Sequence, residues 1–235
     1  FDSVAAGHWF GTIASEPGSS GDLMATKAVA VEHGDHWMFS GHKHMGSGSG
    51  VTSFMITVAR PEREAEADLF LLDVRDRAWD GSEGIKLLAE WDGYGMAATN
   101  SHAFLYDDMP AQRFAMPGQI SVIAPQVLPY ISTTFCAVVV GVLDAAMAAA
   151  TAYLGPKAQS LRALERREWT HALNQQWLAQ SALETMISAC ERGGDPNAAA
   201  RHGKVCISEL SESAMNSLAK AVGGRAARFG ARMAP

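Results

Sequence analysis

The hydrophobic and polar positions along the chain follow two different patterns, and the first covers residues 1–118. Short apolar segments there alternate in part with polar residues, and turn residues separate them at close intervals. KAVAVEH and WMFSGHK flank Gly34–Asp35, which is typical of a β-hairpin turn. Further strands are predicted in HWFGTIA, SFMITVARP, LFLLDVRD and SHAFLYDDMPAQRF. Many short strands with close turns predict a β-barrel or sandwich.

The second pattern, over residues 119–235, is helical. Phe135 to Tyr153 is apolar nearly all round, which predicts a helix covered on all sides. Two further helices are predicted over residues 165–191 and 198–222, with Asn197 as an N-cap after the break GGDPN. The last of them has apolar residues at helical spacing: Ile207, Leu210, Ala214, Leu218 and Ala221. We therefore expect an α+β multidomain chain, a β domain over 1–118 and an incomplete antiparallel helical bundle over 119–235.

Composition and charge narrow the class of protein. The chain has 235 residues and a net charge of −6, so no basic excess supports nucleic-acid binding. Cys136, Cys190 and Cys206 are widely spaced and odd in number, which favours a reducing cytoplasm, and no signal peptide is visible. Phe135–Leu154 is long enough to span a bilayer, but Asp144 near its centre would be costly there. We predict a buried bundle helix and no membrane partner.

Two stretches of small residues are candidate ligand loops. In GTIASEPGSSGD, Glu16–Pro17 ends the strand and a run of glycine and serine follows. One interpretation is a surface turn; the other is a loop whose backbone amides approach a flat or phosphorylated ligand. HMGSGSG allows the same two interpretations. His42 and His44 share a strand face, but no carboxylate or cysteine supports them, so no metal site is predicted.

Four stretches, taken in order, resemble the signatures of the acyl-CoA dehydrogenase flavoprotein superfamily. They are SEPGSSGD, WMFSGHKHMGSGSG, EWDGYGMAATNSHAFLYDDMPAQR and AVGG at 221–224. The resemblance implies a middle β domain followed by part of the C-terminal helical domain. It also implies that the family's N-terminal helical domain precedes Phe1 and that the end of the bundle follows Pro235.

The resemblance implies non-covalent FAD as the cofactor and assigns residues to it. The flavin side comprises Ala14, Ser15, Ser20, Gly21, Met45 and Ser47. Gly223 and Gly224 would reach from a partner subunit, and Lys157 and Lys220 stand where the family has an arginine and a glutamine. Gly21, Met96 and Thr99 are implied on the substrate side. Ser15 replaces the family threonine, Met45 its ring-covering tryptophan and Ala97 its arginine.

The implied activity is α,β-dehydrogenation of an acyl-CoA, as in fatty acid β-oxidation, with electrons passed to an electron-transfer flavoprotein. This reaction needs a carboxylate base, and the family glutamate is expected beyond Pro235. Two alternatives remain open. A flavin-dependent monooxygenase of the same fold is favoured by HMGSGSG and by the missing tryptophan and arginine. A non-catalytic subunit of a heteromeric acyl-CoA dehydrogenase is favoured by Gly21, Lys157 and Lys220. A homo- or hetero-oligomer, dimer or tetramer, is expected in each case.

Overall fold

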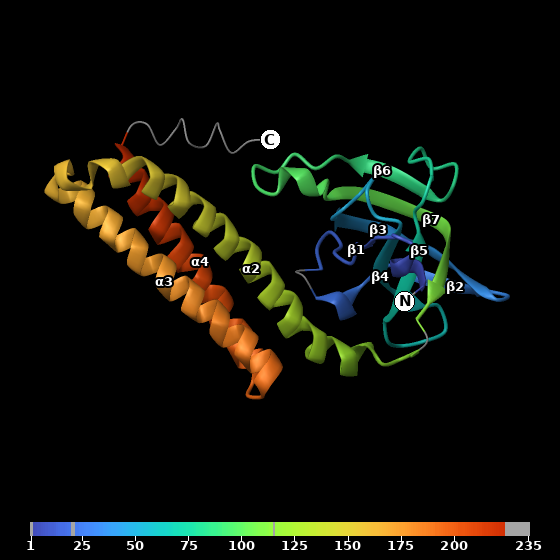
Figure 1. The fold of residues 1–235 in the computed structure, drawn as a ribbon. Coiled ribbons are helices and arrows are strands. Elements are labelled where there is room, and N and C mark those ends of the chain that lie inside the picture. Colours follow the sequence, from blue (N-terminus) through green and yellow to red (C-terminus); the bar gives the residue numbers. More distant parts are fainter. Residues whose placement is uncertain (1, 20–21, 115, 224–235) are drawn as a thin grey trace. The chain divides into compact units, whose positions relative to one another are not determined.

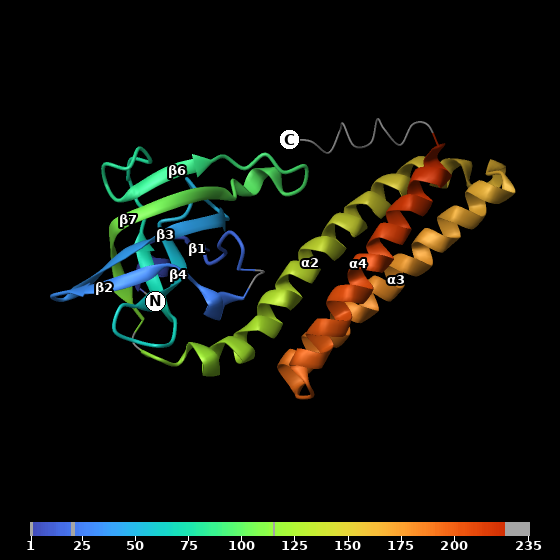
Figure 2. The same ribbon diagram turned by 180° about the vertical axis from the view of Figure 1, so that it is seen from behind.

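The computed structural model describes residues 2–19, 22–114 and 116–223. The chain divides into two compact units, Phe1–Val122 and Ile123–Pro235. Figure 1 and Figure 2 show the strands of the first unit and the long helices of the second from opposite sides. Each unit is described by itself below.

The first unit is a closed barrel with two additional strands. Its strands are β1 (Phe10–Thr12), β2 (Val29–His33), β3 (His36–Gly46), β4 (Phe54–Pro61), β5 (Asp68–Asp73), β6 (Ile85–Ala89) and β7 (His102–Arg113). The short helices are α1 (Asp2–Ala5), η1 (Leu23–Ala25) and η2 (Ala97–Thr99). The order β4-β2-β3-β7-β5 closes because β5 also pairs with β4. β1 lies parallel to β4, and β6 pairs with β7.

The predicted hairpin and the predicted barrel are both confirmed. β2 and β3 are antiparallel, with His33 opposite His36 across a turn in which Gly34 has φ +67°. Such a positive φ is readily available to glycine. The barrel encloses a core of alternate strand residues that includes Phe39, Phe70 and Phe104. β6 was missed, because IKLLA follows a charged loop and has little alternation.

The second unit contains three long helices: α2 (Ile120–Leu154), α3 (Ala163–Arg192) and α4 (Pro196–Val222), with η3 (Gly155–Ser160) between the first two. They run up, down and up (Figure 1). α2 begins well before the predicted Phe135 and continues through Pro125 and Pro129. Each proline removes one helical hydrogen bond. Both lie in the first turns of a long helix, where Pro125 is exposed, so the helix tolerates them.

The expectation that α2 is covered on all sides is wrong within the part of the chain described. One face is buried, and it comprises Cys136, Val140, Leu143, Met147, Ala150 and Leu154. The exposed large hydrophobics of α2 are Val122, Val127, Leu128, Tyr130, Ile131, Phe135, Val138, Val139 and Val142. Among the described residues, the helical stretch Ile120–Ser160, formed by α2 and η3, is long and apolar enough to cross a membrane by length and composition alone.

Asp144 has a structural role inside this apolar helix. Its Oδ1 accepts hydrogen bonds from the side-chain amides of Gln176, at 2.6 Å, and Gln180, at 2.9 Å. Both glutamines lie on α3, so the carboxylate links two helices of the bundle. Asp144 is only partly buried, and these two hydrogen bonds offset part of the cost of removing its carboxylate from water.

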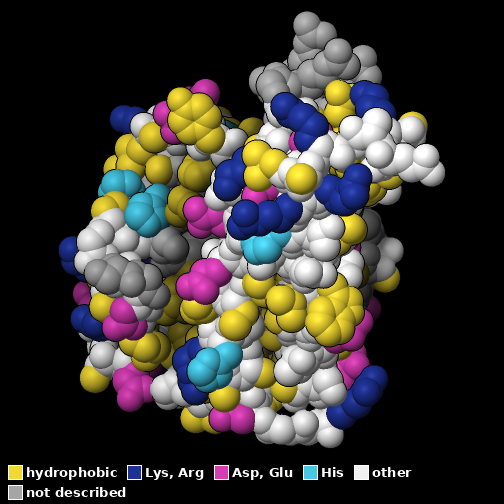
Figure 3. Space-filling model, turned by 90° about the vertical axis from the view of Figure 1, so that its left-hand side faces the viewer, with side chains coloured by type: hydrophobic (Ala, Val, Ile, Leu, Met, Phe, Trp, Pro, Cys, Tyr) yellow, Lys and Arg dark blue, Asp and Glu magenta, His cyan; other side chains and the backbone are white. Residues whose placement is uncertain are grey.

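α3 and α4 pack against each other over much of their length. The N-cap of α4 is Asp195, not the predicted Asn197, because its carboxylate accepts from the Ala198 N–H and Pro196 takes the first helical position. The predicted apolar face of α4 is confirmed, since Ile207, Ala214, Leu218 and Ala221 are buried and Leu210 is partly buried. On the face of the helices that Figure 3 shows, scattered hydrophobic side chains lie among charged and polar ones.

Candidate functional site

Two segments that the sequence singled out lie side by side in the first unit. Residues 12–15 run antiparallel to residues 44–47, with bridges Thr12↔Ser47 and Ser15↔His44. The His44 N–H donates to the Ser15 carbonyl at 3.0 Å. The pairing places Ala14 and Ser15 beside Met45 and Ser47, so four of the predicted cofactor residues form one patch.

A bulge at the end of β3 directs Met45 outward. The register between β3 and β7 shifts between Lys43 and Gly46, and Met45 has φ +59°, a conformation uncommon for a residue with a side chain. Its side chain is 48% exposed. Gly46 cannot be replaced easily, because a Cβ there would lie 2.6 Å from Cδ1 of Ile13. The bulge therefore presents a thioether to solvent, next in sequence to His44, the residue paired with Ser15.

Three hydroxyl groups form a hydrogen-bonded chain behind this patch. The Ser47 and Ser101 hydroxyls are 2.8 Å apart, and those of Ser101 and Thr99 are 2.7 Å apart. The Thr99 hydroxyl donates to the Met96 carbonyl at 2.7 Å. Gly48 N–H also donates to the Thr99 carbonyl at 2.7 Å. The predicted substrate-side residues Met96 and Thr99 are thus connected to the predicted cofactor residue Ser47.

A buried ion pair fixes the loop under the same patch. Lys43 Nζ lies 2.6 Å from Glu16 Oε1, and their side chains are 0% and 4% exposed. The ammonium also donates to the Val58 carbonyl at 2.6 Å and to the Thr26 hydroxyl at 3.1 Å. Glu16 accepts from the Thr26 hydroxyl and from the Lys27 N–H, the latter at 2.7 Å. Each ion therefore has the extra partners that a buried charge requires.

The hydrogen-bond partners of Glu16 and Lys43 determine the pKa shifts of the two side chains. Burial alone would raise the pKa of Glu16, but hydrogen bonds from Lys43, Thr26 and Lys27, together with the lysine charge, lower it to about 2. Burial lowers the pKa of Lys43, and the Glu16 carboxylate opposes that shift only in part. Glu16 is therefore ionised throughout the neutral range. The carboxylate in the SEPG segment is a buried anchor rather than an exposed ligand.

The remaining predicted site residues belong to the second unit or fall outside the described residues. In the second unit, Lys157 Nζ lies 4.0 Å from the centre of the Tyr153 ring, and Lys220 Nζ lies 4.0 Å from Glu168 Oε2. Gly223, also in that unit, is the C-cap of α4. Ser20, Gly21 and Gly224 are outside the described residues.

Sequence reasoning missed the ion pair between Glu16 and Lys43, whereas it placed Ser101 with Thr99 in the segment expected to form either core or site wall. The two hydroxyls meet because η2 ends at Thr99 and Asn100 has φ +44°, a turn that the sequence did not predict. Glu16 and Lys43 are 27 positions apart, and neither shows local spacing that would suggest a pair. The one feature of the sequence that pointed to Glu16 is its position beside Pro17, in a loop with few other charged residues.

Comparison with known proteins gives structural matches. Butyryl-CoA dehydrogenase from Megasphaera elsdenii matches with a TM-score of 0.75 and 16% identity, over 95% of this chain and 60% of its own. Glutaryl-coenzyme A dehydrogenase, in complex with glutaryl-CoA, matches at 0.77 and 20%, over 91% and 56%. FMN-bound TdsC from Paenibacillus sp. A11-2 matches at 0.74 and 17%, over 97% and 65%. No family model matches the sequence, and no curated protein matches it either.

These matches establish the fold. The chain has the acyl-CoA dehydrogenase fold, so the predicted resemblance and the predicted fold class are confirmed at this level. The chain spans less than two thirds of each of these three structures. At identities of 20% or below, these matches show the fold of the chain and do not show which reaction it takes part in.

Proposed function

We propose that this chain belongs to a flavin-dependent oxidoreductase and carries the FAD-contacting part of an acyl-CoA dehydrogenase. The observation that carries the proposal is the antiparallel pairing of residues 12–15 with residues 44–47. It gathers Ala14, Ser15, Met45 and Ser47 into one patch, in a fold shared with two acyl-CoA dehydrogenases and an FMN-bound protein. We assign the flavin and substrate side to residues 1–118 and the incomplete bundle to residues 119–235.

The residues of the patch fit a flat ring with polar edges. Met45 is half exposed, and a methionine packs well on an aromatic face. The Ser15 hydroxyl has no hydrogen-bond partner among the described residues, so it is available to a ligand. Ser47 is held by Ser101 at 2.8 Å. These groups would hold the flavin, and the Glu16–Lys43 pair would keep their loop in place.

The reaction that we propose is removal of two hydrogens from an acyl-CoA. A bound flavin supplies the acceptor for the hydride. Thr99 and Ser101 keep the Ser47 hydroxyl oriented, while Met96 and Thr99 bound the substrate side. The base that removes the acidic proton would be a glutamate outside these 235 residues. An electron-transfer flavoprotein as acceptor, a dimeric or tetrameric assembly and a cytoplasmic location complete the proposal.

The test uses the full-length protein purified with its chromophore. Anaerobic mixing with a panel of acyl-CoA thioesters should bleach the visible flavin absorbance. A Ser15→Ala variant should bind FAD more weakly, and Ser19→Ala, which removes a nearby hydroxyl that donates to the Glu16 carbonyl, is the matched control. Protein that shows no flavin absorbance and gains none with added FAD would contradict the proposal.

A flavin-dependent monooxygenase is the second candidate. The exposed Met45 favours it, since the predicted family tryptophan is absent there. In that case the flavin would be reduced only by an external reductase, and oxygen consumption would follow. A third candidate, a non-catalytic subunit, would copurify with an active homologue and would show neither bleaching nor oxygen uptake when isolated.

A further inference from the structure

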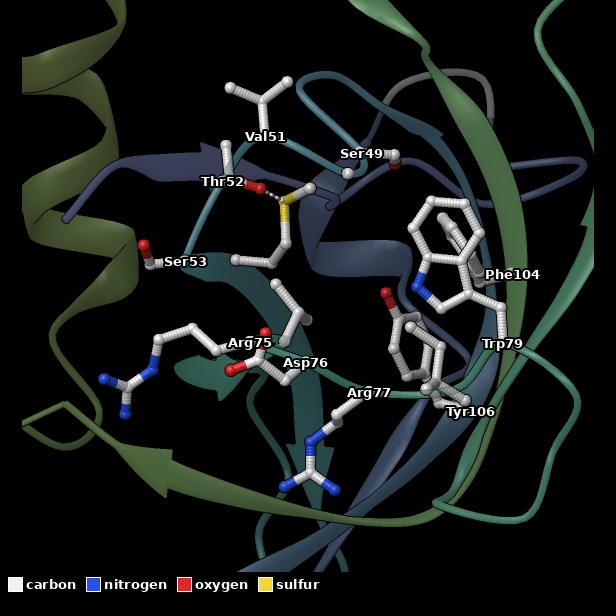
Figure 4. A pocket seen from close by; sticks show the side chains of 14 residues that line it. Ser49, Val51, Thr52, Ser53, Arg75, Asp76, Arg77, Trp79, Phe104 and Tyr106 are labelled. Atoms are coloured by element: carbon white, nitrogen blue, oxygen red, sulfur yellow. Dashed lines mark hydrogen bonds between the residues drawn. The ribbon is translucent and has the colours of Figure 1, made fainter.

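The barrel contains a cavity that is distinct from the patch described above. It has a volume of about 490 Å³, within the range of small-molecule sites. Two connections form its rim, residues 49–53 between β3 and β4 and residues 74–79 between β5 and β6. Its inner wall is apolar and buried, and consists of Met55, Ile85, Phe104 and the ring of Tyr106. Figure 4 shows Phe104 and Tyr106 on one side of the cavity, with the rim residues Thr52, Arg75 and Arg77 around it.

The Tyr106 hydroxyl is directed into this cavity without a partner. The side chain is 2% exposed, and the hydroxyl points toward the middle of the cavity in Figure 4. It makes no hydrogen bond with any residue that the structure describes. Burial raises its pKa, so the phenol remains protonated and is a donor. A phenylalanine would fill the same space without this donor, so the hydroxyl gives the apolar wall one group with which a ligand, or water in the cavity, can form a hydrogen bond.

A second unpaired donor faces the same space. The indole nitrogen of Trp79 lies on the Tyr106 side of the cavity (Figure 4), and its N–H has no acceptor among the described residues. The Trp79 ring is fixed edge to face on Phe104, with centroids 5.2 Å apart. Phe39 packs in the same way on Tyr106, at 5.3 Å. Neighbouring rings therefore hold both donors in position.

The polar groups of the rim mostly have partners already. Ser49 donates to the Gly46 carbonyl at 2.6 Å, and Thr52 donates to the Gly48 carbonyl at 3.1 Å. Arg75 pairs with Asp73, whereas Arg77 donates to the Asp73 carbonyl and extends away from the centre of the cavity (Figure 4). Since Asp76 adds a negative charge at the rim, the charges there have both signs and do not select an ion.

We propose that this cavity binds a small neutral molecule with an apolar body and one carbonyl oxygen. Tyr106 and Trp79 are both donors, and a carbonyl oxygen has two lone pairs that can accept from both. The apolar body would lie against Met55, Ile85 and Phe104. The site uses none of the residues assigned to the flavin, so it does not depend on the proposed function.

The experiment uses full-length protein and two probes of equal shape. Acetophenone carries the carbonyl, and α-methylstyrene replaces its oxygen with a methylene group. We expect acetophenone to bind in calorimetry or ligand-observed NMR and to bind more tightly than α-methylstyrene. Tyr106→Phe should weaken acetophenone binding roughly 2- to 10-fold and leave α-methylstyrene unchanged. Trp79→Phe, which keeps a ring in place, should weaken it similarly.

Tyr94→Phe is the matched control, because Tyr94 is fully exposed and lines no part of the cavity. It should leave the binding of both probes unchanged. Failure of acetophenone to bind would overturn the proposal, and the phenol and indole donors would then be satisfied by water alone. Equal binding of the two probes, or equal acetophenone binding by the wild type and both cavity variants, would overturn it as well.

Discussion

Replacing Lys43 with methionine removes the ammonium group that neutralises the buried Glu16 while filling most of its volume. Glu16 keeps its hydrogen bonds from Thr26, Lys27 and Ala28 but becomes a buried anion without its counterion. Its pKa of about 2, against an ordinary 4.5, corresponds to about 3 kcal/mol in favour of the ionised form. Breaking one side of a buried pair costs about 3–5 kcal/mol. We expect Lys43→Met to lower the free energy of unfolding by about 3 kcal/mol.

The double variant Lys43→Met/Glu16→Gln removes both charges, and so distinguishes the cost of an unpaired buried charge from the contribution of the intact pair. The amide that replaces the Glu16 carboxylate is uncharged, and its carbonyl oxygen can still accept from the backbone at Lys27. Because burial lowers the pKa of Lys43 even with Glu16 present, the intact pair as a whole contributes little. The double variant should therefore recover at least half of the loss. Urea unfolding at neutral pH, monitored by circular dichroism, gives the free energy of unfolding of the single and the double variant. A single variant destabilised by less than about 1 kcal/mol, or a double variant as unstable as the single one, would refute the reasoning.

Three further predictions follow from the packing. The ionised Glu16 carboxylate contributes to stability above pH 4.5, and this contribution is lost as the pH falls toward 2. The urea midpoint of Glu16→Gln should therefore depend less on pH over that interval than the midpoint of the wild type. Gly203→Ala should lower the thermal midpoint, because the new Cβ would lie 2.2 Å from Sδ of Met186, whereas Gly141→Ala, with open space around it, should raise stability by about 0.5–1 kcal/mol. Asp144→Ala should lower the free energy of unfolding by about 0.5–1.5 kcal/mol, because two partly buried hydrogen bonds between α2 and α3 are lost, and no change in chemical unfolding would contradict that role.

The elements that could be predicted from sequence are those with a local cause. Gly34–Asp35 specifies the hairpin because a two-residue turn with positive φ needs such residues, and the alternation on either side sets the faces. The spacing of Ile207, Ala214 and Leu218 likewise specifies the buried face of α4. These features depend on residues close together in the sequence.

The features that were not predicted depend on residues far apart in the sequence, or on prolines that a long helix accommodates. The Glu16–Lys43 pair joins positions 27 residues apart, and only barrel closure brings them together. The first turns of α2 were missed because a proline normally argues for a helix end, whereas Pro125 and Pro129 each cost this long helix one hydrogen bond. The exposed side of α2 could not be foreseen, since an apolar helix gives no sign of which face is covered.

The three linked hydroxyls also have a direction. Each hydroxyl has one hydrogen to give, and Thr99 gives its hydrogen to the Met96 carbonyl. Ser101 must then donate to Thr99, and Ser47 must donate to Ser101. The outer end of the chain, at Ser47, is left with lone pairs only. A ligand atom that forms a hydrogen bond with the Ser47 hydroxyl must therefore be the donor. The three hydroxyls thus distinguish ligands by their protonation as well as by their shape.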